Sequence, residues 1–598
     1  MNDQLNSTPE SQDFGQFTKN LTQIAEKSQR IVQDFLSKQA EQSDGAMGMP
    51  TNVGTAFLEM TKEMMANPVK VFEAQMELWQ GYLELWQHAT NRAMGIEAAP
   101  VIEPEDSDRR FEHPEWDNNP MFAYIKQSYL LTSRWMQSLP SKAENLDPDD
   151  ARKVDFYTRQ FVNAIAPSNF VLTNPEVLQA TIESRGENLV RGLQNLLEDL
   201  ESGKGHLQIL QTDPDAFKLG KNIASTPGKV VYQSDLMQLI QYEPTTKQVY
   251  KRPLLIIPPW INKYYILDLR EKNSFVRWAL EKGHTVFMIS WVNPDERYAD
   301  KSFEDYMYEG PLAALDAIEK ATGEKQANVV GYCIGGTLLA STLAYLAANN
   351  DRRVHSATFL TTMVDFEEPG ELAVFIDEEQ LAELEEKMDN RGYLEGREMA
   401  TTFNMMREND LIWSFVVNNY LLGKDPFPFD LLFWNSDSTR MPAKMHSFYL
   451  RHMYLENRLS KPKGITLGST PIDLRKVKVP TYLLACREDH IAPWKSVYAA
   501  TQLYGGTNRF VLSASGHVAG VVNPPAKNKY GFWTSDTNPG TPEAWLAGAE
   551  QKEGSWWQDW AKWIAGQGGS KVEARLPGKG GLKPIEAAPG SYVKVSSS

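Results

Sequence analysis

Cysteine is the scarcest chemically reactive residue in this chain of 598 residues, which contains only Cys333 and Cys486. Two cysteines are a poor disulfide framework for so long a chain, so each is interpreted separately. The sequence also lacks paired Cys or His ligands, a G-x-G-x-x-G motif after a predicted strand, and a phosphate-binding P-loop. We therefore predict no structural metal and no nucleotide redox cofactor, and we expect cofactor-free chemistry.

Concentrated positive charge and long apolar runs are missing as well. The formal charge is −16 at pH 7, and no Lys/Arg run forms the basic face that phosphate recognition requires, which argues against nucleic-acid binding. Apolar runs such as LLASTLAYLAA fall short of the ~18 residues that a membrane-spanning helix needs. The first residues lack the basic start and apolar core of a secretory signal. We expect a cytoplasmic protein with only peripheral contact to any lipid-like surface.

Residues 1–207 carry helical patterns, and two of these form apolar stripes. Steps of three and four residues define a first stripe, with Ser28 at its one polar place, comprising Phe14, Phe17, Leu21, Ile24, Ile31 and Phe35. The same steps define a second stripe, comprising Val69, Phe72, Met76, Trp79, Leu83 and Trp86. Further helical patterns cover 119–145, 150–166 and 174–203. We expect an all-helical N-terminal region.

From about residue 208 to 598, short β-branched runs alternate with helical stretches, which is typical of a mostly parallel sheet with crossover helices. The predicted strands are 253–259, 284–291, 327–332, 354–362, 480–486 and 509–514. Their order suits an α/β-hydrolase core. The gap between the fourth and fifth strands is too long for one crossover, so we expect a cap insertion over about 365–475, with helical patterns over 378–389 and 396–422.

Cys333 occupies the centre of GYCIG, at the end of a predicted strand and the start of a predicted helix. A Gly-x-nucleophile-x-Gly sequence in that position forms a tight elbow that projects the nucleophile into a pocket. The amide of Ile334 would lie at the helix N-terminus and donate to an oxyanion, and the amide of Trp260, after the first core strand, is the second candidate donor. A buried cysteine in a glycine-rich turn is the alternative interpretation.

The predicted partners of Cys333 follow in the order that α/β-hydrolases use, nucleophile, acid and then histidine. Asp489 follows the strand at 480–486, and His517 follows the strand at 509–514. His490 neighbours the acid and is a rival base or a substrate contact, whereas fold order favours His517. Cys486 ends a predicted buried strand and is interpreted as a core residue.

Cysteine in place of serine favours acyl transfer. A thiolate attacks thioesters readily, and the resulting enzyme thioester keeps enough transfer potential to acylate an alcohol. In this scheme His517 takes the proton of the thiol, or of the attacking hydroxyl, while Asp489 orients the imidazole.

Matching stretches run through most of the chain from about residue 108 and include FVNAIAPSNFVLTNPEVL, PPWINKYYILDLR, GYCIGGT, FWNSDSTRMP, REDHIAPW, SGHVAG, NPPAKNKYGFW and SYVKV. In these the chain resembles the polyhydroxyalkanoate synthases of the single-subunit class I type. The resemblance implies polymerisation of (R)-3-hydroxyacyl-CoA with release of CoA, on a polyester held as a thioester. It carries over Cys333 as nucleophile, Asp489 as acid and His517 as base, and it implies a homodimer at the surface of intracellular polyester granules.

Two other functions stay open at this point. A cysteine-dependent thioesterase or polyester depolymerase of the same fold would use water as the acceptor, and a granule-surface scaffold would use the fold without chemistry. The N-terminal stripes suit binding to a granule, to a granule-coating protein or to the sister subunit, and equally packing against the protein's own core. The monomer side-chain length, the CoA-binding residues and the open or closed state of the cap are not predicted.

Overall fold

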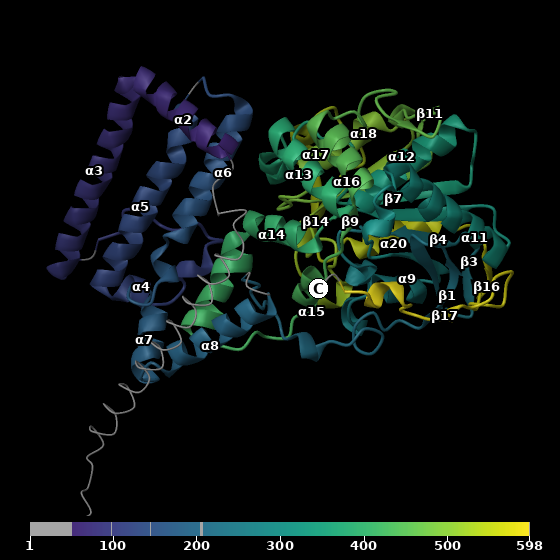
Figure 1. Cartoon of the computed structure of the whole chain (residues 1–598), viewed down its shortest axis with the longest axis horizontal. Helices are drawn as coiled ribbons and strands as arrows, with labels where there is room; N and C mark the ends of the chain where they lie inside the picture. Colours follow the sequence, from purple (N-terminus) through teal and green to yellow (C-terminus); the bar gives the residue numbers. More distant parts are fainter. Residues whose placement is uncertain (1–50, 97, 144, 204–206, 597–598) are drawn as a thin grey trace, which may run out of the picture. The chain divides into compact units, whose positions relative to one another are not determined.

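The computed structural model describes residues 51–596 except residues 97, 144 and 204–206, and these form two compact units (Figure 1). Unit 1 comprises the described residues up to Asp213 together with Arg407–Phe427, and unit 2 comprises Pro214–Met406 and the described residues from Pro428 onward. Among the helices within these described ranges, none combines the length and the apolar character needed to cross a bilayer.

Unit 1 is helical, as predicted. Its longer helices run nearly unbroken and are α2 (Thr51–Ala66), α3 (Pro68–Ala93), α5 (Pro120–Lys142), α6 (Pro148–Ala164), α7 (Pro175–Glu183) and α8 (Glu187–Ser202). Three of them start at an Asn or Asp whose side chain accepts from a first-turn amide, followed by proline at the first helical position: Asn119-Pro120, Asp147-Pro148 and Asn174-Pro175. This pairing satisfies an end amide and fixes a helical φ, so it sets where each helix begins.

The predicted helix over 174–203 is two helices. Arg185 and Gly186 both have positive φ, 54° and 82°, and the chain turns there between α7 and α8. Gly192 lies inside α8, where an added Cβ would fall 1.8 Å from the carbonyl oxygen of Tyr420. Glycine is therefore required for close backbone approach at this place.

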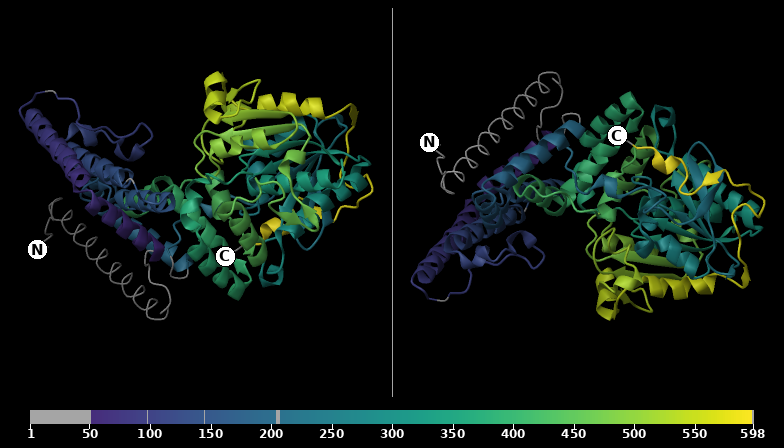
Figure 2. Two further views of the ribbon diagram at one scale, coloured as in Figure 1. Left: turned by 90° about the horizontal axis from the view of Figure 1, so that it is seen from above. Right: turned by 90° about the horizontal axis from the view of Figure 1, so that it is seen from below.

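Helix α3 presents two different faces. Ala74, Gly81, Leu85 and His88 are buried, and α3 packs along α5. Figure 2 shows these long helices running beside each other in both views. The second predicted stripe, from here on the α3 stripe, lies exposed and consists of Val69, Phe72, Met76, Trp79, Leu83 and Trp86. It does not pack against the described core. The first stripe, over residues 14–35, lies outside the described residues.

Part of the predicted cap insertion belongs to unit 1. The helical pattern over 396–422 forms α14 (Gly396–Met406) in unit 2 and then the π-helical turns η9 (Asn409–Trp413) and η10 (Val416–Leu421) in unit 1. In unit 1 the Tyr420 hydroxyl donates to Asp199 at 2.5 Å, and the Asn188 amide donates to the Leu421 carbonyl at 2.8 Å. These long-range bonds tie the segment to α8.

Unit 2 contains all six predicted strands. They lie parallel in the order β5-β4-β6-β7-β12-β13, with β4 Leu254–Ile257, β5 Val286–Trp291, β6 Ala327–Tyr332, β7 Val354–Leu360, β12 Thr481–Cys486 and β13 Asn508–Ser513. Antiparallel strands that were not predicted extend both edges: β1 (Gly228–Gln233), β2 (Met237–Tyr242) and β17 (Glu586–Ala587) beyond β5, and β14 (Gly531–Thr534) and β15 (Glu550–Glu553) beyond β13.

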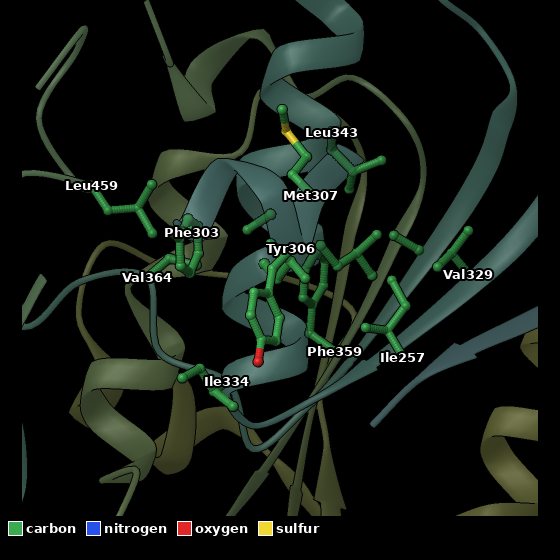
Figure 3. Close-up of a cluster of buried hydrophobic side chains, with 14 of the residues drawn as sticks. Ile257, Phe303, Tyr306, Met307, Val329, Ile334, Leu343, Phe359, Val364 and Leu459 are labelled. Carbon is green, nitrogen blue, oxygen red and sulfur yellow. The ribbon is translucent and has the colours of Figure 1, made fainter. Parts of the chain in front are cut away.

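Apolar side chains pack on both faces of this sheet. Leu255 and Ile257 of β4 join one buried cluster, and the alternate residues Leu254 and Ile256 join the other, as the period of two requires. Figure 3 shows part of the first cluster, which includes Ile257 and Phe359 of the sheet and, on the other side of Tyr306, Ile334 of helix α12 (Ile334–Ala348). The two clusters hold the carboxyl ends of the central strands in fixed positions.

The chain between β7 and β12 supplies further helices to unit 2. They are α13 (Glu378–Arg391), α14, α15 (Asp430–Ser436), α16 (Ala443–Tyr449) and the π-helical turn η11 (Leu450–Leu455). Several of their buried residues, among them Leu381, Met445 and Met453, join the first cluster. This insertion is therefore packed onto the core of unit 2. Its function as a movable cap stays a prediction.

Candidate active site

Cys333 lies between β6 and α12, at the N-cap of the helix, with φ 52° and ψ −125°. This is a sparsely populated backbone region for a residue with a Cβ, and such strain marks nucleophile elbows. The flanking glycines explain how the turn closes. A Cβ on Gly331 would lie 2.5 Å from Gly336 Cα, and one on Gly335 would lie 2.4 Å from the Ile257 carbonyl oxygen. The Cys333 side chain itself is partly exposed.

Asp489 and His517 meet from the loops after β12 and β13. His517 Nδ1 lies 2.7 Å from Asp489 Oδ2, and both side chains are buried. The other carboxylate oxygen accepts from the amides of Ile491 and Ala492, at 2.9 and 2.8 Å. Asp489 is thereby held by its own loop and aims one oxygen at the imidazole, which leaves Nε2 to face away from the acid.

The electrostatics of His517 link it to Cys333 as well. Burial opposes a charged imidazole, but the charge of Asp489 and then of Cys333, with hydrogen bonds to both side chains, raises the pKa of His517 to about 10. The structure thus brings together all three residues of the predicted triad. An imidazolium stabilised in this way can hold a proton taken from the thiol, and their catalytic roles stay a prediction.

Tyr332 is a site residue that the sequence interpretation missed. Its hydroxyl donates to the His517 carbonyl oxygen at 3.1 Å, and its ring lies parallel to the imidazole with centroids 5.7 Å apart. Its pKa is raised well above the usual value, first by burial and then by the charges of Cys333, Cys486 and Asp489. The only clue in the sequence was that Tyr332 directly precedes Cys333. Side chains alternate along a strand, so the side chain of residue 332 points away from the elbow and toward the loop of His517.

The insertion supplies two more tyrosines near the sulfur. Tyr449 of α16 and Tyr454 of η11 are buried, with ring centroids 5.4 Å apart. Burial raises the pKa of both hydroxyls, and the charge of Cys333 raises them further. Both phenols therefore stay neutral, close enough to Cys333 to be affected by its charge. Nothing in their local sequence signalled this, because the contact depends on how a long insertion folds back.

The predicted oxyanion donors lie on adjoining segments. Gly335 contacts the carbonyl oxygens of Ile257 and Pro258 so closely that the first turn of α12 must lie against the loop after β4. Amides in a first helical turn lack intrahelical acceptors, so the Ile334 N–H is available for an anion. The Trp260 carbonyl oxygen accepts a hydrogen bond from the Thr439 hydroxyl, which helps to hold this segment in place. Both donors stay predictions that this geometry favours.

The two remaining candidates differ in position. Cys486 is fully buried at the end of β12, where burial first raises the pKa of its thiol, which confirms its interpretation as a core residue. His490 is half-buried beside Asp489, and its backbone oxygen lies close to Gly370. Its contact with substrate stays a prediction. Within the described ranges, no three His, Cys, Asp or Glu residues lie close enough together to hold a metal ion.

Comparisons with known proteins agree on one family. Residues 107–279 match the N-terminus of poly-beta-hydroxybutyrate polymerase (PhaC), and residues 254–524 match the alpha/beta hydrolase fold. The chain is 50% identical to a poly(3-hydroxyalkanoate) polymerase of Methylorubrum extorquens, over 99% of both chains. It is 47% identical to the poly(3-hydroxyalkanoate) polymerase subunit PhaC of Rhizobium meliloti, over 96% of this chain and 94% of the relative, and 44% identical to that of Cupriavidus necator, over 89% of each. Together with the α/β-hydrolase sheet of unit 2, these matches show that the chain belongs to the poly(3-hydroxyalkanoate) polymerase family.

Proposed function

We propose that this protein polymerises (R)-3-hydroxyacyl groups from CoA thioesters into a polyester, with Cys333 carrying the acyl group and CoA released. The observation that carries the proposal is the buried contact of His517 with Asp489 and with the Cys333 side chain, in a chain of this family. The CoA thioester is a substrate, and the proposed chemistry uses no further cofactor.

The first half-reaction is acylation of the enzyme. His517 takes the proton of Cys333, and the sulfur attacks the thioester carbonyl of the incoming substrate. Negative charge develops on the carbonyl oxygen, where the amides of Ile334 and Trp260 are the proposed donors. The bond to the CoA sulfur then breaks, and the imidazolium supplies the proton that the leaving thiolate takes up. Asp489 stays ionised and keeps the imidazole aligned.

The second half-reaction forms the ester. The 3-hydroxyl of a further monomer, or of the growing chain, attacks the acyl-cysteine carbonyl while His517 takes the hydroxyl proton. The carbon–sulfur bond breaks, the Cys333 thiolate leaves, and an ester one unit longer remains. Because a thioester is exchanged for an oxygen ester, the transfer is downhill without another energy source.

The acceptor distinguishes this reaction from hydrolysis by the same fold. The buried rings of Phe366, Tyr449 and Tyr454 pack together, with Phe366 and Tyr454 centroids 4.9 Å apart, and the two tyrosines are close enough to Cys333 to be affected by its charge. This buried aromatic cluster would limit the access of water and favour an acyl chain that carries its own hydroxyl.

The test is to supply (R)-3-hydroxybutyryl-CoA and to analyse the acyl product together with CoA release. Insoluble polymer supports the proposal, whereas free hydroxy acid identifies a thioesterase or depolymerase. The Cys333→Ala variant should release no CoA above background and form no acyl-enzyme by mass spectrometry. Release at the normal rate by this variant would show that Cys333 does not carry the acyl group, whereas a wild-type protein that releases no CoA would leave only a scaffold function.

The same scheme accounts for where the protein acts. A polyester chain bonded to Cys333 tethers the enzyme to its insoluble product, so we propose that it resides in the cytoplasm at the granule surface, as a homodimer and beside granule-coating proteins. Cys333→Ala again provides the test. If the protein is tethered through its product, this variant, purified and then mixed with polymer made by a separate synthase, should not be recovered with the polymer.

A further inference from the structure

Lys263 is a buried lysine three residues after Trp260, in the loop that follows β4. Its side chain is only 3% exposed, and its ammonium donates to the carbonyl oxygen of Val595 at 2.6 Å, 332 positions further along the chain. Burial lowers the pKa of Lys263, because the charged form loses its hydration. Lysine is almost never fully buried without a compensating partner. This long-range contact therefore indicates a specific role for the side chain.

The loop that contains Lys263 is held on one side by the insertion between β7 and β12. The Trp260 carbonyl oxygen accepts from the Thr439 hydroxyl, and the Ile261 carbonyl oxygen accepts from the Thr439 amide at 2.9 Å. The Lys263 carbonyl oxygen accepts from the Trp434 indole at 2.7 Å. All three donors belong to the insertion, so these bonds make the loop follow the insertion.

The Lys263 side chain holds the loop from a different element. It binds segment 591–595, which packs on the sheet. Val593 of this segment is buried in the second of the two apolar clusters on the sheet, and the Tyr592 amide donates to the Gln238 side chain of β2 at 3.2 Å. The ammonium therefore ties the loop to the sheet and not to the insertion.

A second side chain closes these contacts into a ring. The Asn293 side-chain amide, two residues after β5, donates to the same Val595 carbonyl oxygen at 3.3 Å, and its oxygen accepts from the Arg440 amide at 2.9 Å. Asn293 thus joins Val595 to the insertion. The ring runs from the loop to the insertion, through Asn293 to Val595, and through Lys263 back to the loop. In a connected network of hydrogen bonds, each member limits the movement of the others.

We propose that Lys263 is a positioning residue for the Trp260 amide, and that segment 591–595 is the fixed point against which it holds the loop. The inference rests on the proposed function, in which this amide stabilises the negative charge on the acyl oxygen. Such a donor is effective only within ~2.7–3.1 Å of the place that the oxygen comes to occupy. Any shift of the insertion during substrate entry or product release pulls on the loop through Thr439 and Trp434. The bond of Lys263 to the sheet-bound segment opposes that shift.

A purely structural role makes a different prediction for the same position. Replacing a buried charge by a well-packed apolar side chain of similar volume is often neutral or stabilising. Methionine has a similar length to lysine, and Asn293 would still donate to the Val595 oxygen. A residue that only fills space should therefore tolerate Lys263→Met. A positioning residue should not, because methionine cannot bind segment 591–595.

The first test compares Lys263→Met with Lys126→Met in the full chain. Lys126 of α5 is a matched buried lysine, 5% exposed, whose ammonium pairs with Asp117 in unit 1. Lys263→Met should lower kcat for CoA release about 10- to 100-fold and change KM less than about 2-fold, as expected for a misplaced oxyanion donor. Amide hydrogen exchange of residues 260–266 should become faster. Lys126→Met should keep both kcat and this exchange rate at the wild-type values.

The second test changes the length of the chain. Ending the chain after Val595 turns the bonded carbonyl into a carboxylate, which should bind the Lys263 ammonium more strongly and keep the wild-type kcat. Ending it after Gly590 removes segment 591–595 and should reproduce both effects of Lys263→Met. Combining that truncation with Lys263→Met should add little, because both changes remove the same contact.

Three results would overturn the inference. They are a wild-type kcat in Lys263→Met, a fall in its kcat with unchanged exchange of residues 260–266, and normal turnover by the chain that ends after Gly590. If Lys263→Met does not fold, the chain that ends after Gly590 takes its place in both comparisons. A wild-type protein that forms no acyl-enzyme on Cys333 would instead contradict the proposed function, and the exchange measurement would still decide whether Lys263 holds the loop.

Discussion

The Tyr332 hydroxyl donates to the carbonyl oxygen of His517, 185 positions further along the chain. Tyr332 directly precedes Cys333 and is fully buried under the imidazole. One side chain therefore connects the elbow that presents the sulfur to the loop that presents the imidazole. The distance between Cys333 and His517 depends on this bond as well as on the sheet.

Tyr332→Phe should lower kcat about 3- to 10-fold with little change in KM. The variant loses one hydrogen bond and leaves a carbonyl unpaired, which costs about 1 kcal/mol of unfolding free energy and loosens the loop of the base. Steady-state kinetics and urea unfolding measure both effects. Tyr482→Phe is the matched control, because it removes a buried hydroxyl bonded to Asp559 at 3.1 Å. It should lose similar stability and keep kcat, and equal kinetic loss in both variants would contradict a positioning role for Tyr332.

Gly335→Ala should destabilise the fold by at least ~2 kcal/mol and abolish activity. The new Cβ would overlap the carbonyl oxygens of Ile257 and Pro258, and backbone atoms cannot move aside as a flexible side chain can. The midpoint of urea unfolding provides the measurement. Gly566→Ala in α20 (Trp557–Gln567) is the control, since nothing lies within 4 Å of its Cβ position. It should gain up to about 1 kcal/mol from helix propensity. Unchanged stability in Gly335→Ala would rule out the tight elbow.

The pH dependence of CoA release should move when Asp489 is changed. His517 has a pKa raised to about 10, so the folded protein keeps this proton until the pH approaches 10. The stability that the proton contributes is fully present below the ordinary value near 6.5 and is lost as pH rises through about 10. In Asp489→Asn the charge that chiefly raises the pKa is removed, so the alkaline loss of single-turnover CoA release should begin at lower pH. An alkaline limb at the same pH in both proteins would argue against His517 as the titrating group.

Thr439→Val should reduce kcat about 10-fold at constant KM if Trp260 supplies an oxyanion amide. The Thr439 hydroxyl donates to the Trp260 carbonyl oxygen and so holds the Trp260–Ile261 peptide. Without it, the adjoining Pro259–Trp260 peptide, which carries the N–H donor, is less firmly positioned. Thr501→Val is the control, a buried threonine whose hydroxyl bonds the Tyr498 carbonyl oxygen at 2.8 Å on α18 (Ala500–Leu503). If the two variants lose activity equally, Trp260 is not held for catalysis by this bond.

The central strands and the loops of the triad could be predicted because their signals are local. β-branched runs define the strands, and a sharp turn with small neighbours defines the elbow at Cys333. Strand β2, which pairs with β5 and β1, escaped prediction because its buried Gln238 is satisfied by Glu586 and Ser591, about 350 positions later. The proximity of Tyr449 to the sulfur depends in the same way on the fold of the insertion, which no local pattern encodes.

Periodicity also could not show which unit a helical stretch joins. The pattern over 396–422 is helical throughout, yet its first part buries Met406 in unit 2 and its later part buries Tyr420 in unit 1. Both parts have apolar residues at helical spacing. Only the partners differ, and those are set by residues such as Asp199 and Asn188 far away in the chain.

The excursion of Arg407–Phe427 into unit 1 means that the backbone passes between the two units three times, at 213, 406 and 427. A single proteolytic nick near Asp213 therefore leaves Arg407–Phe427 covalently attached to unit 2, and the two fragments stay together only through noncovalent contacts within unit 1. A truncated protein that starts at Pro214 would keep Arg407–Phe427 but lose α8. The Tyr420 hydroxyl would then lose its bond to Asp199, and the Leu421 carbonyl would lose its bond from Asn188. Cutting this polypeptide at any one junction therefore divides unit 1, unit 2 or both, and does not separate unit 1 from unit 2.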